Sequence, residues 1–121
     1  MRENYIEQTL RNAIKQQGGW CIKWVAPGTA GVPDRICILP GGIVAFVELK
    51  APGKSVAKGG LQAFWQQELH RLGCYAYIVS TPGEARSLAD YLGSVSKALT
   101  VVEHPSLPGK AVKWAQRDGK L

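Results

Sequence analysis

The sequence predicts an α/β domain in which helices flank a mixed β-sheet, in the order helix, three strands, helix, strand, helix (αβββαβα). Three observations support this prediction. Apolar residues recur at helical spacing in three segments, and β-branched and aromatic residues cluster in four short segments. A strand–helix–strand succession over residues 43–79 also implies a parallel strand pair beside an antiparallel hairpin. We therefore expect an antiparallel meander joined by one parallel strand.

The first two elements are a helix and a strand. Apolar spacing predicts the helix over residues 3–17, and Gly18-Gly19 supplies its end. Residues 20–25 are rich in aromatic and β-branched residues and predict the strand. Trp20 and Trp24 share one face of this strand, so we expect both to pack in the core.

The next two strands are expected over residues 35–39 and 43–49, joined by the tight turn Pro40-Gly41-Gly42. Antiparallel pairing across this turn would place Asp34, just before one strand, close to Glu48 near the end of the other. The hairpin therefore predicts that the two carboxylates converge.

The second half of the predicted domain contains two helices and one strand. A helix is expected over residues 61–72, with its apolar residues, Trp65 among them, forming one buried stripe. A strand follows over residues 75–79. Thr81-Pro82-Gly83-Glu84 then supplies an N-cap, an early proline and a capping-box glutamate for the last helix.

Domain organisation follows from where this periodicity stops. Residues 1–92 are expected to form one domain, and 121 residues are enough for a single core. Residues 93–121 lack sustained periodicity and carry several lysines and arginines, which predicts a basic arm of unknown role. Trp114 in this arm is a candidate for stacking on a nucleic-acid base.

Composition narrows the functional classes. The net charge of +6 and the isoelectric point near 9.4 favour a polyanionic partner. No apolar run is long enough to span a bilayer, and the polar start does not resemble a secretory signal, so the cytoplasm is expected. Cys21, Cys37 and Cys74 lie in apolar runs without metal-site spacing, which predicts buried free thiols rather than a zinc site or disulfides.

The residues with the clearest chemistry are Asp34, Glu48 and Lys50. Mg²⁺ binds through one or two carboxylates and stabilises the charge that builds up when a phosphodiester is hydrolysed. Asp34 and Glu48 could be those ligands, the backbone carbonyl of Leu49 could be a third, and Lys50 could assist catalysis. The alternative is structural: Asp34 ends a turn, and Glu48 pairs with Lys50 on a solvated strand face.

This combination resembles the PD-(D/E)XK nuclease superfamily, which has a restriction-endonuclease-like core with the predicted order of elements. More narrowly, it resembles the VRR-Nuc family, in which a Gly-x-Pro-Asp turn precedes the hairpin and Glu-x-Lys ends it. Gly31-Val32-Pro33-Asp34 and Glu48-Leu49-Lys50 match these motifs. Glu7 on the first helix and Gln62 on the second match two further positions. The resemblance covers about residues 3–92.

The resemblance implies roles for Glu7 and Gln62 that the residues alone leave open. Glu7 would hold a water molecule or a second cation at the metal site, whereas its spacing also permits an exposed ion pair with Arg11. Gln62 would contact the site or the cleaved strand, although a solvated glutamine is the alternative.

Three further residues are candidates for binding DNA phosphates. Lys54 and Lys58 follow the Glu-x-Lys motif in a loop, where they could lie along the backbone of the nucleic acid. Thr29 precedes Asp34 and could donate a hydrogen bond to a phosphate. Solubilising surface residues are the alternative for all three.

The expected function is a Mg²⁺-dependent, structure-specific DNA endonuclease in which Mn²⁺ substitutes for Mg²⁺. The resemblance implies cleavage of Holliday junctions or other branched DNA by a homodimer, from a bacterium or a phage-infected cell. One alternative is a flap, single-strand or duplex nuclease of the same fold. Another is a non-catalytic nucleic-acid-binding module, which the basic charge would also suit.

Overall fold

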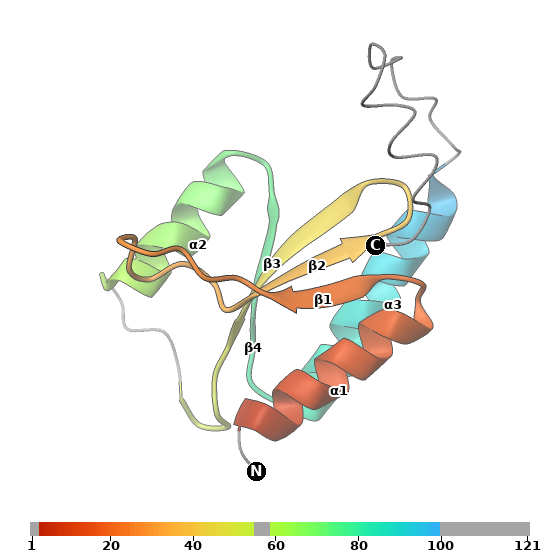
Figure 1. Cartoon of the computed structure of the whole chain (residues 1–121), viewed down its shortest axis with the longest axis horizontal. Helices are drawn as coiled ribbons and strands as arrows, with labels where there is room; N and C mark the ends of the chain where they lie inside the picture. The colour runs from red at the N-terminus through yellow and green to blue at the C-terminus, as the bar shows by residue number, and fades with distance from the viewer. Residues whose placement is uncertain (1–2, 55–58, 100–121) are drawn as a thin grey trace.

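The computed structural model describes residues 3–54 and 59–99, which form a four-stranded sheet with helices on both faces (Figure 1). The predicted αβββαβα order and mixed sheet are confirmed. The helices are α1 (Glu3–Gln16), α2 (Leu61–Arg71) and α3 (Pro82–Ala98). The strands are β1 (Trp20–Lys23), β2 (Arg35–Leu39), β3 (Ile43–Leu49) and β4 (Tyr75–Val79).

The sheet follows the chain in the spatial order β1-β2-β3-β4. The first three strands form an antiparallel meander, and β4 lies parallel to β3 after the crossover through α2. The predicted turn joins β2 to β3, and both Gly41 and Gly42 adopt positive φ there, a conformation that side chains disfavour. The hairpin is held to α3 because the Ser96 hydroxyl donates to the Pro40 carbonyl at 2.6 Å.

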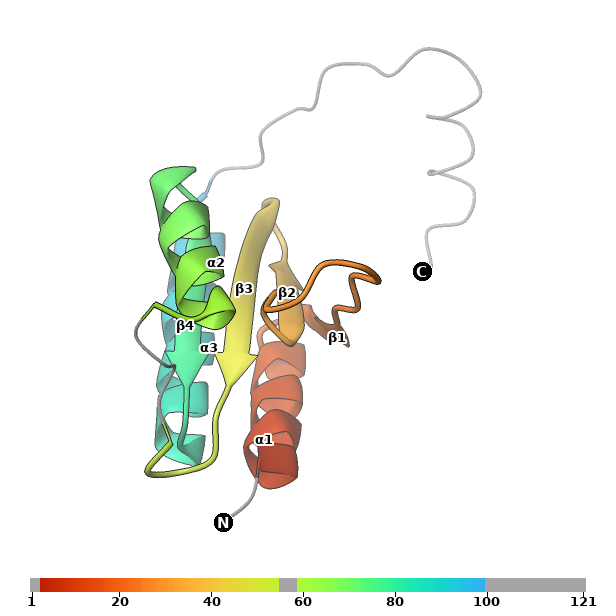
Figure 2. The ribbon, with the colours of Figure 1, turned by 90° about the vertical axis from the view of Figure 1, so that its left-hand side faces the viewer.

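The hydrophobic core lies on one face of the sheet, where α1 and α3 pack side by side (Figure 2). Every second residue of β2 and β3 points into this core, as strand geometry requires. The helices contribute the residues that their periodicity predicts, and these are fully or almost fully buried: Ile6, Leu10, Ile14, Ala85, Leu88, Ala89 and Leu92.

The opposite face is only partly covered, because α2 packs against β4 at one edge of the sheet. Four large apolar side chains therefore remain exposed on β1, β2 and β3: Trp20, Ile22, Ile38 and Val44. We call these four residues the apolar strip. The prediction that Trp20 packs in the core is wrong, since its side chain is 50% exposed. Trp24 is half-buried and packs on Phe46 with ring centroids 5.3 Å apart.

Helix α2 also departs from its predicted packing. Leu61 is 58% exposed, and Phe64 is exposed as well, whereas Gln66 and Leu69 are buried. Trp65 is half-buried and donates its indole N–H to the Ala30 carbonyl at 3.1 Å. The prediction of one buried apolar stripe is therefore wrong. The buried side of α2 is the one that carries Gln66 and Leu69, and Leu61 and Phe64 lie outside it.

Helix α3 is longer than the sequence indicates. It runs to Ala98, so the expected domain boundary after residue 92 falls inside it. Gly93 is buried and lies against the side chain of Gln17, so this glycine permits close helix packing and does not end the helix. Residues 100–121, which hold Trp114 and most of the predicted arm, lie outside the described residues.

The start of α3 has the predicted capping. The Thr81 hydroxyl accepts from the Glu84 N–H at 3.0 Å, and the Glu84 carboxylate accepts from the Ser80 N–H at 2.7 Å. Among the described residues, no helix combines the length and hydropathy that crossing a bilayer requires. The cysteines are free, but only Cys37 is buried as expected, and Cys21 and Cys74 are half-buried.

Candidate active site

The β2–β3 hairpin brings the two predicted carboxylates together. Its register pairs Arg35 with Val47, and one further step places Asp34 opposite Glu48. The Leu49 N–H donates to Asp34 Oδ2 at 3.0 Å, so the Asp34 side chain reaches the backbone of β3. The expected convergence of the two carboxylates is thus present.

Asp34 is also held through its backbone. Its carbonyl accepts from the Trp24 N–H at 2.8 Å, which continues the β1–β2 ladder past the last strand residues. Pro33, just before it, is fully buried. Asp34 is therefore an exposed residue whose backbone carbonyl is bonded to Trp24, next to β1, and whose carboxylate is bonded to β3.

Glu48 is the most unusual residue of this region. It is 2% exposed, and neither carboxylate oxygen has a hydrogen-bond partner among the described residues. Burial, together with the neighbouring Asp34 carboxyl group, raises the pKa of Glu48 to about 8. An unpartnered buried carboxylate destabilises a fold unless a cation or a proton neutralises it. Glu48 is therefore well suited to receive a cation.

The backbone carbonyl of Leu49 points toward the same region. The Lys50 N–H donates to the Val79 carbonyl of β4 at 2.9 Å. In a trans peptide the preceding carbonyl points the opposite way, so the Leu49 oxygen is directed away from β4 and toward the Asp34 side. A third oxygen ligand is therefore available beside the two carboxylates.

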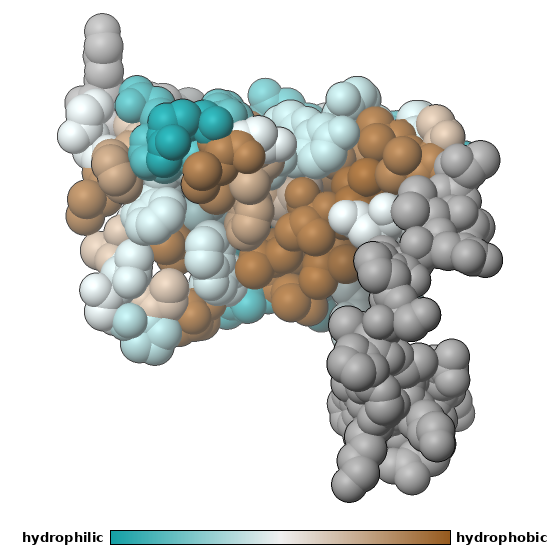
Figure 3. Space-filling model, turned by 90° about the horizontal axis from the view of Figure 1, so that it is seen from above, coloured by the Kyte–Doolittle hydropathy of each residue, from teal (hydrophilic) through white to brown (hydrophobic). Residues whose placement is uncertain are grey.

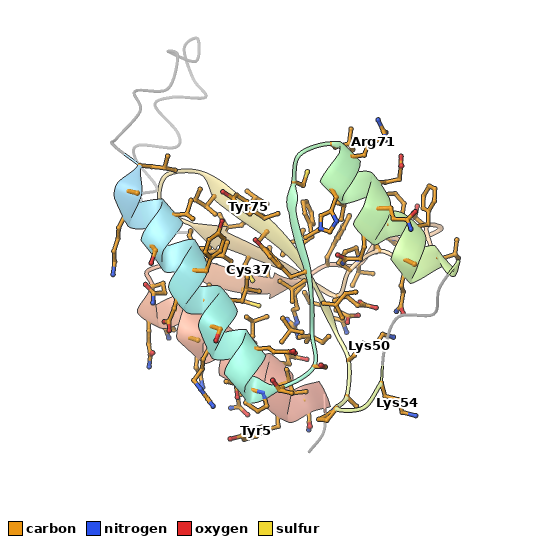
Figure 4. All side chains as sticks on the ribbon, turned by 180° about the vertical axis from the view of Figure 1, so that it is seen from behind. Tyr5, Cys37, Lys50, Lys54, Arg71 and Tyr75 are labelled. Atoms are coloured by element: carbon orange, nitrogen blue, oxygen red, sulfur yellow. The ribbon has the colours of Figure 1, made fainter. Side chains whose placement is uncertain are left out.

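Lys50 lies at the end of β3, with Lys54 in the loop that follows (Figure 4). Its Nζ is 3.8 Å from Glu48 Oε2, at the long limit of an ion pair, and it lowers the pKa of Glu48 less than burial raises it. The structural alternative, a Glu48–Lys50 pair on a solvated strand face, does not fit a Glu48 that is almost fully buried.

Glu7 does not join this group. It forms an ion pair with Arg35, so the alternative pairing with Arg11 is not observed either. Strand alternation directs Arg35 to the α1 face of the sheet and Glu48 to the α2 face. Within the described residues, no three His, Cys, Asp or Glu side chains gather as a metal-binding cluster. The structure therefore pairs Glu7 with Arg35 rather than with Asp34 and Glu48.

Gln62 lies in the first turn of α2 and is half-buried. Gln66, one turn later, is buried and donates to the Tyr77 carbonyl at 3.4 Å. Because Gln62, Gln66 and Leu69 follow helical spacing, Gln62 lies on the side of α2 that turns toward the sheet.

The structure describes two of the three residues predicted to contact phosphates. Thr29 and Lys54 are exposed in the loops on either side of the hairpin, and Lys58 lies outside the described residues.

Two polar residues that the sequence reasoning missed help to build this region. Arg35 is buried beside Asp34, and Gln66 anchors α2 to β4. Both could have been found from spacing. Arg35 alternates with Cys37 and Leu39 on an inward strand face, and Gln66 stands one turn after Gln62 in a helix whose period was already assigned.

The donor set can be tested against the expected cation. Two carboxylates and one backbone carbonyl form an all-oxygen set, which suits a hard divalent ion such as Mg²⁺. The orphaned oxygens of Glu48 provide the structural reason for a cation there. Asp34, Glu48 and Leu49 therefore fit the metal that the sequence predicts.

Comparison with known proteins gives one sequence relative. No family model matches the chain. A protein of Acyrthosiphon pisum secondary endosymbiont phage 1, named "Putative nuclease p44", is 48% identical over 54 residues. The match covers 45% of this chain and 58% of the phage protein, so it spans little more than half of that relative's length.

A solved structure extends the comparison to about three quarters of the chain. It is a "VRR_NUC domain" with a TM-score of 0.68 and 22% sequence identity, and the match covers 74% of this chain and 95% of that one. Its likeness establishes the fold, and the phage relative agrees with it. The resemblance that the Gly-x-Pro-Asp and Glu-x-Lys motifs indicate is confirmed: the chain has the restriction-endonuclease-like fold of a VRR_NUC domain.

Proposed function

We propose that this chain is a Mg²⁺-dependent endonuclease that hydrolyses phosphodiester bonds in branched DNA. The observation that carries the proposal is the buried Glu48 carboxylate, which has no hydrogen-bond partner in the described structure and stands opposite Asp34. The name of the phage relative supports nuclease activity. The motif resemblance supports branched DNA as the substrate.

Each residue has a defined part in this mechanism. Asp34, Glu48 and the Leu49 carbonyl would hold Mg²⁺, which when bound polarises the phosphate and lowers the pKa of water. Lys50 would orient the attacking water or neutralise charge on the phosphoryl oxygens, because its ammonium group lies next to Glu48. Gln62 would contact the cleaved strand from α2, and Thr29, Lys54 and Lys58 would contact neighbouring phosphates. Mn²⁺ would substitute for Mg²⁺.

The proposal is tested with the purified chain on a four-way junction in Mg²⁺, Mn²⁺ or chelator. Cleavage is expected with either metal and is lost in chelator and in the Asp34→Ala and Lys50→Ala variants. Glu68→Ala is the matched control, since Glu68 pairs with Arg71 on the solvent side of α2. Equal cleavage by all variants, or cleavage that persists in chelator, contradicts the proposal.

Substrate preference is tested separately with equal concentrations of junction, flap, duplex and single-stranded DNA. We expect the junction to be cut fastest, in two matched strands. A higher rate on flap, single-stranded or duplex DNA would support the nuclease activity and contradict branched DNA as the preferred substrate.

The same proposal includes a homodimer, because resolving a junction requires two matched cuts. The apolar strip supplies a surface for it, and hydrophobic residues gather in a broad patch in the space-filling view (Figure 3). An apolar surface can face a second copy of itself without like-charge repulsion, which matters in a chain of charge +6. Phe46, on the same face, connects the strip to Glu48 two residues later.

The dimer is tested by light scattering and sedimentation at micromolar concentrations. Ile38→Glu is expected to give monomers, because it places a charge inside the strip. Tyr5→Glu makes a similar change at an exposed position on α1 and should leave the dimer intact. A monomeric wild-type chain, or two variants that behave alike, would remove the dimer and leave the nuclease assignment untouched.

The basic charge also favours a second candidate, a non-catalytic nucleic-acid-binding module. This module would bind DNA equally well in chelator and after the Asp34→Ala change, and it would cut no substrate with any metal. Metal-dependent cleavage by the wild-type chain excludes it.

A further inference from the structure

Cys21 and Cys37 face each other across strands β1 and β2. The register pairs the two residues directly, and the Trp24 N–H to Asp34 carbonyl bond sets the phase of this ladder. Hydrogen-bonded and non-hydrogen-bonded pairs alternate, so Trp24–Asp34 is hydrogen-bonded and Cys21–Cys37 is not. In a non-hydrogen-bonded pair the Cα atoms are about 4.5 Å apart and the side chains are closest. That spacing lies within the range that a disulfide can bridge.

The two thiols have different surroundings. Cys21 is half-buried and lines a recess of about 300 Å³, whose basic residues are Arg11 and Lys15. Cys37 is 0% exposed, and its label in Figure 4 lies over the centre of the sheet. The Cys21 sulfur is therefore accessible from solvent through a basic recess, whereas the Cys37 sulfur is buried next to it.

The electrostatics match this division of roles. The Cys37 thiol, as a hydrogen-bond donor, lowers the pKa of Cys21, and Arg35 and Arg11 lower it further. Burial and the Glu7 carboxylate act in the opposite direction. The hydrogen bond to Cys21 and burial raise the pKa of Cys37. Reactive cysteines are characteristically thiolate-prone, partly exposed and close to a second, resolving cysteine.

We propose that Cys21 and Cys37 form a peroxide-sensitive dithiol that closes into an intrachain disulfide between β1 and β2. The Cys21 thiolate attacks one oxygen of hydrogen peroxide, the O–O bond breaks, and Cys21 becomes a sulfenic acid while hydroxide takes up a proton to leave as water. The Cys37 sulfur then attacks the Cys21 sulfur. The S–O bond breaks, the S–S bond forms, and the Cys37 proton leaves with the hydroxyl as a second water. The two thiols are oxidised and one peroxide is reduced.

This site is separate from the proposed nuclease site. Cys37 lies on the same face of β2 as Arg35, the α1 face, and Cys21 is paired with Cys37 on that face, whereas Glu48 points to the α2 face. The inference therefore stands or fails independently of the metal site.

The experiment treats the full-length chain with increasing hydrogen peroxide, blocks remaining thiols with maleimide after unfolding, and maps the peptides by mass spectrometry. We expect one disulfide per chain, joining the Cys21 and Cys37 peptides, with two maleimide-reactive thiols lost and both recovered by dithiothreitol. Cys74→Ser is the control and should behave as the wild type, because Cys74 is half-buried next to β4.

Two variants separate the roles of the sulfurs. Cys37→Ser should stop at a Cys21 sulfenic acid that dimedone traps, and Cys37→Ala repeats the test if the serine disturbs the core. Cys21→Ser should lose the disulfide and leave Cys37 unoxidised. A disulfide that involves Cys74, oxidation of Cys74 as fast as Cys21, or three intact thiols at stoichiometric peroxide would overturn the proposal.

Discussion

The two faces of the sheet are built for different purposes. On the face covered by α1 and α3, every inward position of β2 and β3 except Arg35 is apolar, and even Arg35 has an ionic partner. The α2 face carries a buried carboxylate without a hydrogen-bond partner among the described residues, and an exposed apolar strip. The α1/α3 face pairs its buried arginine within the domain. The α2 face leaves a carboxylate and an apolar surface available to bind a ligand or a partner.

This difference separates stability from function within one sheet. Strand alternation assigns adjacent residues to opposite tasks, so Val47 completes the core while Glu48 faces the proposed metal site. The following changes test whether the separation is as sharp as the geometry indicates, from the largest expected effect to the smallest.

Glu48→Gln should reduce cleavage in Mg²⁺ on the order of a thousandfold, because it removes a charged ligand while preserving the shape of the side chain. The measurement is a single-turnover rate on the best substrate of the panel, with folding checked by circular dichroism. A rate within tenfold of the wild type would mean that the α2 face does not hold the metal through this residue.

Matched leucines on the two sides compare stability directly. Leu10→Ala, at a position that is 0% exposed on α1, should lower the free energy of unfolding by about 3 kcal/mol. Leu72→Ala, at the end of α2 and 64% exposed, should change it by less than about 0.5 kcal/mol. Urea titrations give both values, and comparable losses would refute the contrast between the faces.

Glu7→Gln tests whether Glu7 stabilises the fold through Arg35 or acts at the proposed metal site. Its ion pair with Arg35 predicts a loss of about 1–2 kcal/mol in the free energy of unfolding, since a buried arginine loses its counter-charge. The cleavage rate should fall less than tenfold. A loss of more than a hundredfold with unchanged stability would instead support the role at the metal that the family resemblance implies.

The raised pKa of Glu48 makes the metal-free protein sensitive to pH. Glu48 ionises near pH 8 in the folded chain and near its ordinary value of 4.5 when unfolded. The folded state therefore binds more protons between these values, and its stability falls as the pH rises from 5 to 8. In chelator, Glu48→Gln should be more stable than the wild type by about 1–2 kcal/mol at pH 8 and equal to it near pH 5. Identical unfolding curves at both pH values would contradict the shift.

Much of the fold could be predicted from local patterns. The strand bounds 35–39 and 43–49, the turn between them and the capped start of α3 were all predicted and are observed. Antiparallel pairing across this turn also predicted that Asp34 lies close to Glu48. These features depend on neighbouring residues and on a short turn, which sequence patterns report well.

The errors concern long-range coverage. Periodicity shows which residues lie on the same face of a strand, as for Trp20, or of a helix, as for the apolar residues of α2. It does not show whether another element covers that face. The domain was expected to end at residue 92, although α3 continues to Ala98 and the small size of Gly93 permits its contact with Gln17. Glu7 was assigned by motif, and its partner Arg35 lies 28 positions later. Contacts between distant segments decide all three.

The Pro40-Gly41-Gly42 turn has a consequence for how such a chain can change over evolutionary time. Because the hairpin register sets Asp34 opposite Glu48, inserting or deleting one residue in the turn would shift the pairing and send Glu48 to the core face. A substitution at Gly41 or Gly42 is disfavoured by their positive φ but keeps the register, whereas a change in length shifts it. We therefore expect this turn to keep its length among functional descendants of the chain.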